Sequence, residues 1–511
     1  MTPMTPMTPM TRKRGFWGAG AAVVTLALLV VAMLHAGALT HAASSKNSSP
    51  YNKPRWWAKY QIVSAPGFTP TAPGKSDSVK VGTNVNVSHE PGPQSETSIA
   101  INPSNPSQLV GGANEIFRLP MRGYFSSDGG ATWGGVDLPL PPPVTNNGFD
   151  FGSDPGVAWD LHGNVYYSYI IVFFSNGGAI NGTEMAVSRS SDGGQTWTPT
   201  YFNFESGEAQ FNDKPMITVD NNAGSPHEGT IYVAWDNATG SSSSSNNLLV
   251  SHSTDHGVTF SAPTVASDIT SGPKAVIAAD PFVGPNGTLF VAWHDVQNSA
   301  IVESSSSDGG NSFGPQHTVS PTQIAFDFPV PAESSRGALL YPACDADRST
   351  GPNRGTLYCS WMDQTASNAT DVFVARSTDG GASWSAPQRV NDDAVGVAND
   401  QFNQWLAVDP TDGSVNVSWS DTRNDSSHLS TDEYFSRSTD GGHTFIANVR
   451  VSTASTNETC CGANLGDQYG DYEGIAAFGG VVHPIWTDRR DGGTVDGFEE
   501  TYTAAITVKK Q

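Results

Sequence analysis

The sequence predicts an all-β fold, a single β-propeller with four-stranded blades. The main observation is an eight-residue pattern, Ser-x-Asp-x-Gly-x-Ser/Thr-Trp/Phe, that occurs six times. Its copies lie 64, 63, 53, 71 and 61 residues apart, and their aspartates are Asp128, Asp192, Asp255, Asp308, Asp379 and Asp440. Repeats at this spacing over most of a 511-residue chain indicate one closed array of similar units. The 53 glycines and 34 prolines fit many short strands joined by turns.

Each copy of the pattern has the chemistry of a tight turn between two strands. The aspartate side chain accepts hydrogen bonds from backbone N–H groups, and glycine adopts positive φ without steric cost. The hydroxyl residue bonds locally to the backbone, and the final ring is buried against the sheet. One active site cannot use six equivalent turns, so we interpret these aspartates as structural.

The residues between the copies repeat one order of strands. In the sixth unit, strands are predicted at 404–409, 414–419, 434–438 and 448–451, with the turn pattern between the last two. Such a unit is a four-stranded propeller blade.

A seventh unit lacks the turn pattern. Its strands are predicted at 473–478, 481–486 and 500–506, after which the chain ends without an outer strand. The segment 83–88 resembles the outer strands of other units and is expected to close the ring by pairing with the C-terminal strands. The sequence therefore favours seven blades, six of them with the turn pattern, closed by an N-terminal strand.

The turn pattern resembles the Asp-box, or bacterial neuraminidase repeat, of sialidase-like β-propellers, and the resemblance covers residues 81 to 507. Sialidase catalytic domains usually have six blades, so a six-bladed propeller is the alternative to seven. Ligands of these propellers bind on the rim opposite the Asp-boxes, close to the axis. The resemblance implies an exported exo-glycosidase of the exo-α-sialidase type, acting on terminal sialic acid or another acidic sugar.

Three arginines are candidates for binding a substrate carboxylate. Arg118, Arg423 and Arg489 fall in the loop between the second and third strands of units one, six and seven, which ring closure makes neighbours. A guanidinium offers a rigid fork of donors that matches two carboxylate oxygens. Sialidases hold the sialic acid carboxylate with three arginines, and residues 117–120 resemble their F/Y-R-I-P motif, although Arg118 lies closer to the first Asp-box than in those enzymes. The alternative is that each arginine pairs with a neighbouring aspartate.

Tyr472, Glu473 and Asp154 are the candidate catalytic residues. Sialidases use a tyrosine nucleophile assisted by a glutamate, and Tyr472 and Glu473 lie where the inner strand of the last unit begins. A tyrosine is a poor nucleophile at neutral pH unless a base takes its proton. Adjacent strand residues point to opposite faces, so the base is expected from another blade, with Glu96 or Asp154 as candidates. Asp154 is the preferred general acid.

Carboxylates begin the first strands of several units, at Glu96, Asp154, Asp213, Asp280 and Glu473. They are expected on the rim opposite the Asp-boxes. Clustered carboxylates at a channel mouth bind a hard cation such as Ca²⁺, perform acid/base chemistry or accept backbone hydrogen bonds. No cofactor is expected to be required, a structural Ca²⁺ stays open, and the sequence does not identify a metal site.

The N-terminus has the features of an export signal. Arg12, Lys13 and Arg14 precede an apolar run from 15 to 39 that ends among small residues. Residues 1–43 are predicted to be a cleaved signal peptide or, since the run is long enough to cross a bilayer, an N-terminal membrane anchor. Residues 44–80 are predicted to be a flexible linker, and the propeller is predicted to occupy residues 81–508. The protein is expected to be secreted or extracytoplasmic.

The formal charge of −23 disfavours nucleic acid and anionic lipid surfaces as partners. A glycan or glycoconjugate is the expected partner, a membrane is expected only through an N-terminal anchor, and the chain is expected to be a monomer. Four cysteines suit an oxidising compartment. Cys344 and Cys359 flank a turn and form the predicted disulfide. For the adjacent Cys460 and Cys461, a vicinal disulfide, separate partners and free thiols all stay open.

Three functions agree with the sequence. The first is the sialidase-type exo-glycosidase, the second is a noncatalytic propeller that binds a glycan or a protein at the cell surface, and the third is a hydrolase of neutral polysaccharides with two catalytic carboxylates. The sequence does not name the sugar or the linkage, and it does not decide whether the protein is catalytic.

Overall fold

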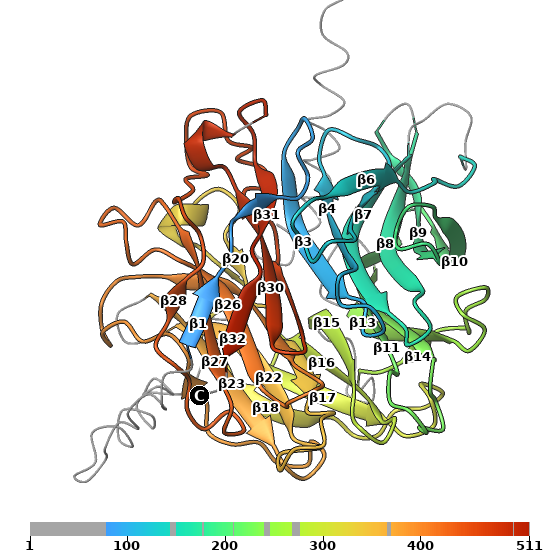
Figure 1. The fold of residues 1–511 in the computed structure, drawn as a ribbon. Helices are drawn as coiled ribbons and strands as arrows, with labels where there is room; N and C mark the ends of the chain where they lie inside the picture. The colour runs from blue at the N-terminus through green and yellow to red at the C-terminus, as the bar shows by residue number, and fades with distance from the viewer. Residues whose placement is uncertain are drawn as a thin grey trace, which may run out of the picture.

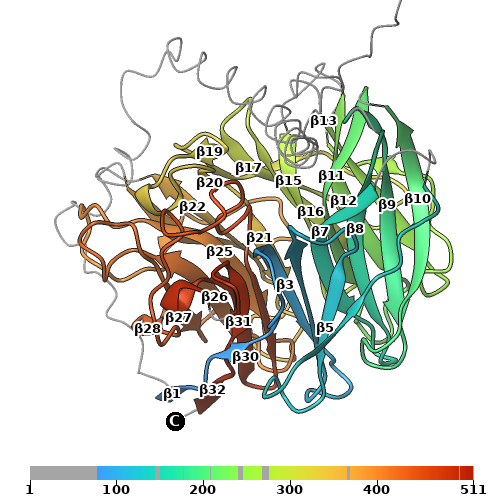
Figure 2. The same ribbon diagram turned by 90° about the horizontal axis from the view of Figure 1, so that it is seen from above.

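Seven antiparallel sheets form a ring around a central axis, so the predicted seven-bladed β-propeller is confirmed (Figure 1). The computed structural model describes residues 78–143, 150–175, 178–207, 209–239, 246–267, 276–364, 369–493 and 495–509. In Figure 2 the colour runs around the ring, and the blue strand β3 lies beside the red strands β30 and β31.

Each of the first six blades contains four strands in chain order. Blade one contains β3 (Gln94–Ile101), β4 (Leu109–Glu115), β5 (Arg122–Ser126) and β6 (Gly134–Asp137), and blade two contains β7 (Asp150–Trp159), β8 (Val165–Phe174), β9 (Ile180–Ser190) and β10 (Thr198–Ser206). Blade three contains β11 (Gln210–Val219), β12 (Ile231–Thr239), β13 (Asn246–Ser253) and β14 (Thr264–Val265), and blade four contains β15 (Val276–Val283), β16 (Leu289–Asp295), β17 (Ala300–Ser306) and β18 (His317–Pro321). Blade five contains β21 (Ala343–Ala346), β22 (Leu357–Gln364), β23 (Thr370–Ser377) and β24 (Gln388–Arg389). Blade six contains β25 (Gln401–Val408), β26 (Val415–Asp421), β27 (Asp432–Ser438) and β28 (Val449–Arg450).

Blade seven combines the two ends of the described chain. Its strands are β29 (Gly474–Phe478), β30 (Val481–Asp488), β31 (Glu500–Thr503) and the N-terminal β2 (Val85–Asn86). Val85 lies opposite Thr503, so the expected closing strand is present. The predicted strand 500–506 is instead two strands, because the pairing of β31 with β30 ends at Thr503. The second strand, β32 (Ile506–Lys509), pairs with the start of β30 and with β1 (Ser78–Val81). A short 3₁₀ helix, η2 (Arg490–Gly492), follows β30.

Strand β1 begins at Ser78, inside the range predicted as linker. The predicted signal peptide or anchor, residues 1–43, and residues 44–77 of the predicted linker lie outside the described residues. Within the described ranges, no helix combines the length and the apolar character that crossing a membrane requires.

The blades pack through large buried rings. The fully buried side chains include five tryptophans near the ends of second strands, namely Trp235, Trp293, Trp361, Trp419 and Trp486. The indoles of Trp419 and Trp486 donate to Asp421 at 2.9 Å and to Asp488 at 2.8 Å. These two acids at the ends of second strands therefore serve the packing of the blades.

The six repeated turns share one hydrogen-bond pattern. In the fifth, Asp379 Oδ1 accepts from the backbone N–H of Ser383 at 2.9 Å and from the Ser377 hydroxyl at 2.8 Å, and Oδ2 accepts from the Ser383 hydroxyl at 2.5 Å. The corresponding backbone bonds end on Asp128, Asp192, Asp255, Asp308 and Asp440. Each turn lies between the third and fourth strands of its blade, which is a structural role.

All four cysteines are paired. Cys344 in β21 faces Cys359 in β22 in the strand register, and the two form a disulfide. Cys460 and Cys461 form a vicinal disulfide. The guanidinium of Arg489 donates to the Cys461 carbonyl oxygen at 2.6 Å.

Candidate active site at the axis

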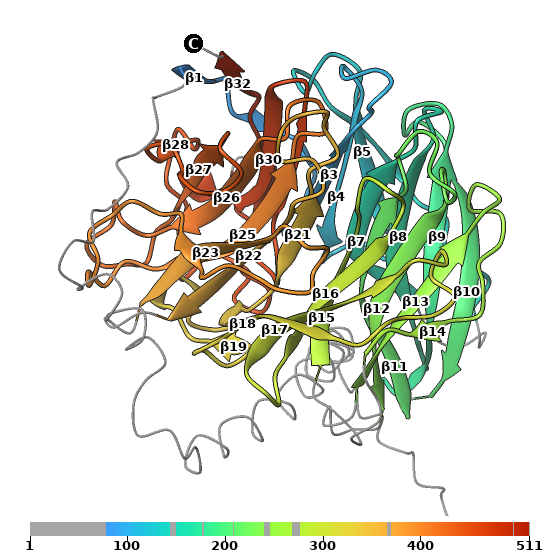
Figure 3. The same ribbon diagram turned by 90° about the horizontal axis from the view of Figure 1, so that it is seen from below.

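The first strands of the blades surround the axis, whereas the last strands, such as β10 and β28, lie at the periphery (Figure 3). Each blade contributes one residue at the same repeat position, two residues before its first strand pairs regularly with the second. We call this set the axial ring; its members are Glu96, Asp154, Lys214, Ala278, Tyr341, Asn403 and Tyr472.

Five members of the axial ring have a left-handed backbone although none is glycine. Their φ values lie between 49° and 68°, and the residues are Glu96, Asp154, Lys214, Ala278 and Asn403. Each lies in a shift of the strand register, which turns the chain locally. Such a backbone costs about 1–3 kcal/mol per residue and is concentrated at functional sites in proteins. The strain makes this end of the axis a candidate site.

Three carboxyl groups meet where blades one to three approach the axis. Asp154 hydrogen-bonds to the side chain of Asp213, and Glu96 also lies within hydrogen-bonding reach of Asp154. Asp154 Oδ2 further accepts from the backbone N–H of Lys214 at 3.1 Å, and Oδ1 accepts from the Ser153 hydroxyl at 2.8 Å. We call Glu96, Asp154 and Asp213 the acid trio.

Two cations and a further carboxylate enclose the acid trio. Lys214 Nζ forms a buried ion pair with Asp471. Arg336 donates through Nε to Asp471 at 2.7 Å and through Nη2 to Glu96 at 3.0 Å. Lys214, Asp471 and Glu96 are almost completely buried, whereas Asp213 is half-buried. Asp213 is therefore the member of the trio that is most open to solvent.

The pKa values of the acid trio are moved in opposite directions. Burial, reinforced by the charge of Asp154, raises the pKa of Asp213 well above its ordinary value despite the opposing charge of Lys214. Burial alone would raise the pKa of Asp154 too, but the Lys214 charge and hydrogen bonds from Asp213 and Ser153 lower it below the ordinary value. Burial and the Asp154 charge raise the pKa of Glu96 to about 8. The surroundings thus favour the ionised form of Asp154 and the protonated forms of Asp213 and Glu96.

Two segments hold Arg336 over the trio. Arg336 lies within a short insertion, between the 3₁₀ helix η1 (Pro331–Glu333) and β20 (Ala338–Leu339), and β20 pairs with β19 (Asp327–Phe328). The second segment, residues 458–472, contains the vicinal disulfide and Asp471, and we call it the capping segment. Gln468 Oε1 in the capping segment accepts from the backbone N–H groups of Ser335 and Arg336 at 3.1 and 3.0 Å.

Tyr472 and Glu473 do not act on one another, as expected for adjacent residues, and the charges of the expected bases Glu96 and Asp154 act on Tyr472. Tyr472 is buried, and its hydroxyl donates to the Pro155 carbonyl oxygen at 3.2 Å. Burial, with the charges of Glu96 and Asp154, raises its pKa well above the ordinary value, which opposes formation of a phenolate nucleophile. Glu473 accepts from the Thr487 backbone N–H at 3.1 Å, and burial and the nearby Glu433 raise its pKa. Both residues lie just before β29, and their side chains contact different groups.

Asp154 lies in the site as expected, but its surroundings disfavour the predicted role as general acid. A general acid must hold a proton, and the surroundings of Asp154 favour its ionised form. The protonated neighbours Asp213 and Glu96 fit that role better.

The three candidate arginines bind different groups. Arg118 pairs with Asp137 at 2.8 Å, and Arg423 pairs with Asp421 and Asp392, each at 2.7 Å. Arg489 donates to the carbonyl oxygens of Gly497 at 2.7 Å and Cys461 at 2.6 Å. Among the described residues, no side chain bonds to two of these guanidinium groups. The expected clamp is thus not formed, because the three guanidinium groups bind separate partners and do not converge on one site.

Lys214, Arg336 and Asp471 were not predicted from the sequence. Lys214 occupies the repeat position of Glu96 and Asp154, so alignment of the first strands would have marked it. Arg336 lies in an insertion that has no counterpart in other blades, and no repeat signal points to it. Within the described ranges, no group of three His, Cys, Asp or Glu side chains has an arrangement suited to a metal ion. A structural Ca²⁺ therefore stays an untested prediction.

Comparisons with known proteins give structural neighbours only. No protein family and no curated protein matches the sequence. A protein of unknown function from Dyadobacter fermentans is 15% identical with a TM-score of 0.42, over 70% of this chain and 95% of that one. A leech intramolecular trans-sialidase is 13% identical with a TM-score of 0.42, over 64% of each chain. An α-L-arabinofuranosidase from Fusarium graminearum is 12% identical with a TM-score of 0.43, over 84% and 98%. The function is therefore argued from the site itself.

Proposed function

We propose that the protein is an exported glycoside hydrolase that uses the acid trio, with Asp213 as general acid and Asp154 as the ionised carboxylate. The observation that carries the proposal is the hydrogen-bonded pair of Asp213 and Asp154, whose pKa values move in opposite directions. Two carboxyl groups whose pKa values are moved apart can serve as general acid and general base. Because the carboxyl groups of glycoside hydrolases lie about 5 Å or more apart, the proposal requires that bound substrate separates Asp213 from Asp154.

The surrounding residues support these roles. The protonated Asp213 donates to the glycosidic oxygen of the leaving group, and the ionised Asp154 takes a proton from water or attacks the sugar. The positive charge of Lys214 keeps Asp154 ionised. Because Asp213 is half-buried and Arg336 covers Glu96, substrate is expected to approach from the Asp213 side.

A neutral glycoside suits this site better than a sialoside. The resemblance to sialidases implies sialic acid, whose carboxylate needs an uncommitted cation. Arg118 and Arg423 are paired with carboxylates, and Lys214 and Arg336 are paired with Asp471. We therefore propose a neutral glycan as substrate and retain the sialoside as an alternative for the assay.

The test is hydrolysis of fluorogenic glycosides by the purified protein, with an α-L-arabinofuranoside and a β-galactoside as neutral substrates and a sialoside for comparison. Asp213→Asn and Asp154→Asn should each lower kcat by about 100- to 10,000-fold. Asp363→Asn is the matched control, since Asp363 is a buried acid that accepts backbone N–H groups at Gln323 and Ile324. Unchanged hydrolysis in both axial variants would refute the assignment.

One observation favours a second candidate, the noncatalytic binding propeller. Arg336 and Lys214 pair with Asp471, and the Lys214 charge lowers the pKa of Asp154, so the charges of the site can compensate one another within the protein, as in a purely structural network. Binding of a glycan without turnover of any glycoside would favour this candidate.

A further inference from the structure

A funnel enters the propeller from the rim that carries the repeated turns. Its outer part has a volume of about 320 Å³ and lies between turns that join first and second strands. Its inner part, about 240 Å³, lies among the first strands. The two parts share Pro103, Asn221, Arg348, Pro410 and Phe478 and are therefore continuous.

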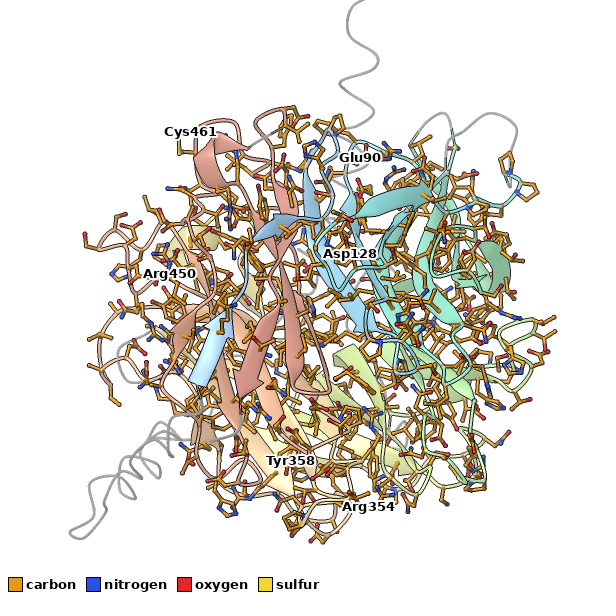
Figure 4. All side chains as sticks on the ribbon, in the orientation of Figure 1. Glu90, Asp128, Arg354, Tyr358, Arg450 and Cys461 are labelled. Atoms are coloured by element: carbon orange, nitrogen blue, oxygen red, sulfur yellow. A yellow bond between two sulfur atoms is a disulfide. The ribbon has the colours of Figure 1, made fainter. Side chains whose placement is uncertain are left out.

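Aromatic side chains close the inner end of the funnel. Trp405 and Tyr472 line the inner cavity, and their ring centres lie 5.8 Å apart. Tyr341 packs against both rings. In Figure 4, Arg354 at the mouth of the funnel lies at the lower edge of the view and Cys461 of the capping segment lies near the upper edge. The funnel thus enters from the end of the axis opposite the capping segment.

The mouth of the funnel carries positive charge in a strongly acidic protein. The guanidinium of Arg354 donates to the carbonyl oxygens of Arg348 at 2.6 Å, Ser349 at 2.8 Å and Pro285 at 3.2 Å. None of the carboxylates in the described part of the chain forms an ion pair with it. Arg348 lies 3.3 Å from Asp345, whose oxygens also accept backbone N–H groups from Ala346 and Val408. The mouth of the funnel therefore favours an anion, whereas the inner part is also lined by Asp280, Asp345 and Glu473.

Two buried polar atoms of funnel-lining residues have no hydrogen-bond partner among the described residues. They are Nε of Arg348, which is a donor, and Oδ1 of Asn221, which is an acceptor. The Asn221 amide nitrogen donates to the Trp159 carbonyl oxygen at 2.8 Å, which fixes the orientation of the amide. Unpaired buried polar atoms are rare in native proteins, and a ligand that pairs with them removes their cost. Such a ligand must accept from arginine and donate to an amide oxygen.

We propose that this funnel binds a hydroxylated carboxylate of the sugar-acid class, such as a uronate. The carboxylate accepts from Arg354 and Arg348, and a hydroxyl group donates to Asn221. Pro103, Pro410 and Phe478 supply apolar surface for a sugar ring. The volume of the outer part is at the lower end of small-molecule sites, which span about 300–1,000 Å³. The site is independent of the acid trio and of the proposed hydrolysis.

Calorimetric titration of the full chain with D-glucuronate tests the proposal, with D-glucose and acetate as separate ligands. Glucuronate should bind more tightly than either, because only it offers both the carboxylate and the hydroxyl groups. Arg354→Gln should weaken glucuronate binding by about tenfold or more. Asn221→Asp keeps the size of the side chain but adds a negative charge beside the ligand, and it should weaken binding similarly. Asn221→Asp also keeps the test valid if Arg354→Gln does not fold.

Arg376→Gln is the control, since Arg376 likewise contacts a carbonyl oxygen and a histidine without a carboxylate. It should leave the Kd unchanged, and so should Asp213→Asn. Equal affinity for glucuronate and acetate, or for glucuronate and glucose, would overturn the proposal. Unchanged binding in the folded Asn221→Asp variant would overturn it too, as would loss of binding in Asp213→Asn.

Discussion

Replacing Lys214 by methionine tests both the stability and the chemistry of the axial site. Met has a similar length and removes only the charged end. In the structure Lys214 Nζ pairs with the completely buried Asp471, and its charge lowers the pKa of Asp154. The variant therefore leaves two buried carboxylates with less compensation.

The expected loss of stability follows from the burial of the pair. Removing one partner of a buried ion pair costs about 3–5 kcal/mol, because the remaining charge stays in a poorly solvated place. Arg336 still donates to Asp471, so the lower end of that range is expected. Restoring neutrality with Asp471→Asn in the same chain should recover part of the loss, which a double-mutant cycle measures as a coupling energy.

The assay is denaturant unfolding of the four chains of the cycle, combined with the hydrolysis assay. Arg437→Met is the matched control, since Arg437 is a buried cation that pairs with Asp412 in blade six, away from the axis. It should lower stability without changing activity per folded molecule, whereas Lys214→Met should also lower activity because Asp154 is less ionised. A loss below about 1 kcal/mol for Lys214→Met, with no coupling to Asp471, would refute the buried pair.

Three further predictions concern the ring, the turns and pH. Deleting residues 1–90 should lower the melting temperature and promote self-association, compared with deletion of residues 1–77. The longer deletion removes β1 and β2 and leaves β31 as an unpaired edge strand. Equal behaviour of the two truncated chains would contradict closure of the ring by the N-terminal strand. Trp384→Ala should lower the free energy of unfolding by less than the loss of about 3–5 kcal/mol that is typical of a buried tryptophan, because this ring is only half-buried. Asp379→Ala should lower the melting temperature while activity per folded molecule persists. Lost activity at unchanged stability would mean that the turns have another role. The pKa of Glu96 is raised in the fold from 4.5 to about 8, so its contribution to stability is present below about pH 4.5 and is lost as pH rises toward 8. Denaturation midpoints at several pH values should fall less steeply for Glu96→Gln than for the original chain, and parallel curves would contradict the shift.

The sequence was sufficient for the parts of the fold that depend on local chemistry. The Asp379 turn is formed by residues within a few positions of one another, so its pattern is visible in the chain. The closing strand was also predictable, because the seventh unit lacked an outer strand and the segment around Val85 had the right character. The boundary at Ser78 and the division of the last strand depended on pairing between chain ends, which a local pattern does not contain.

The axial site could be predicted only in part. Asp154 and Glu96 were expected at the correct rim because they begin first strands. Their partners are distant in sequence: Lys214 and Asp471 are separated by 257 residues, and Arg336 and Glu96 by 240. The lowered pKa of Asp154 could not be predicted, because it depends on the Lys214 charge, which only the folded ring brings near. The arginine clamp was wrong for a similar reason, since Asp137 and Asp421 lie closer to Arg118 and Arg423 than any shared site.

The pairing of β2 with β31 and of β1 with β32 also sets the order of events during biosynthesis. Among the described residues, the first strands to leave the ribosome are β1 and β2, and their partners lie at residues 502–509, so they wait through the synthesis of six complete blades. The ring is sealed only after residues 500–509 have emerged, and the last blade cannot form on a growing chain. A chain interrupted before that point keeps an open edge, which is prone to pair with other chains and to aggregate.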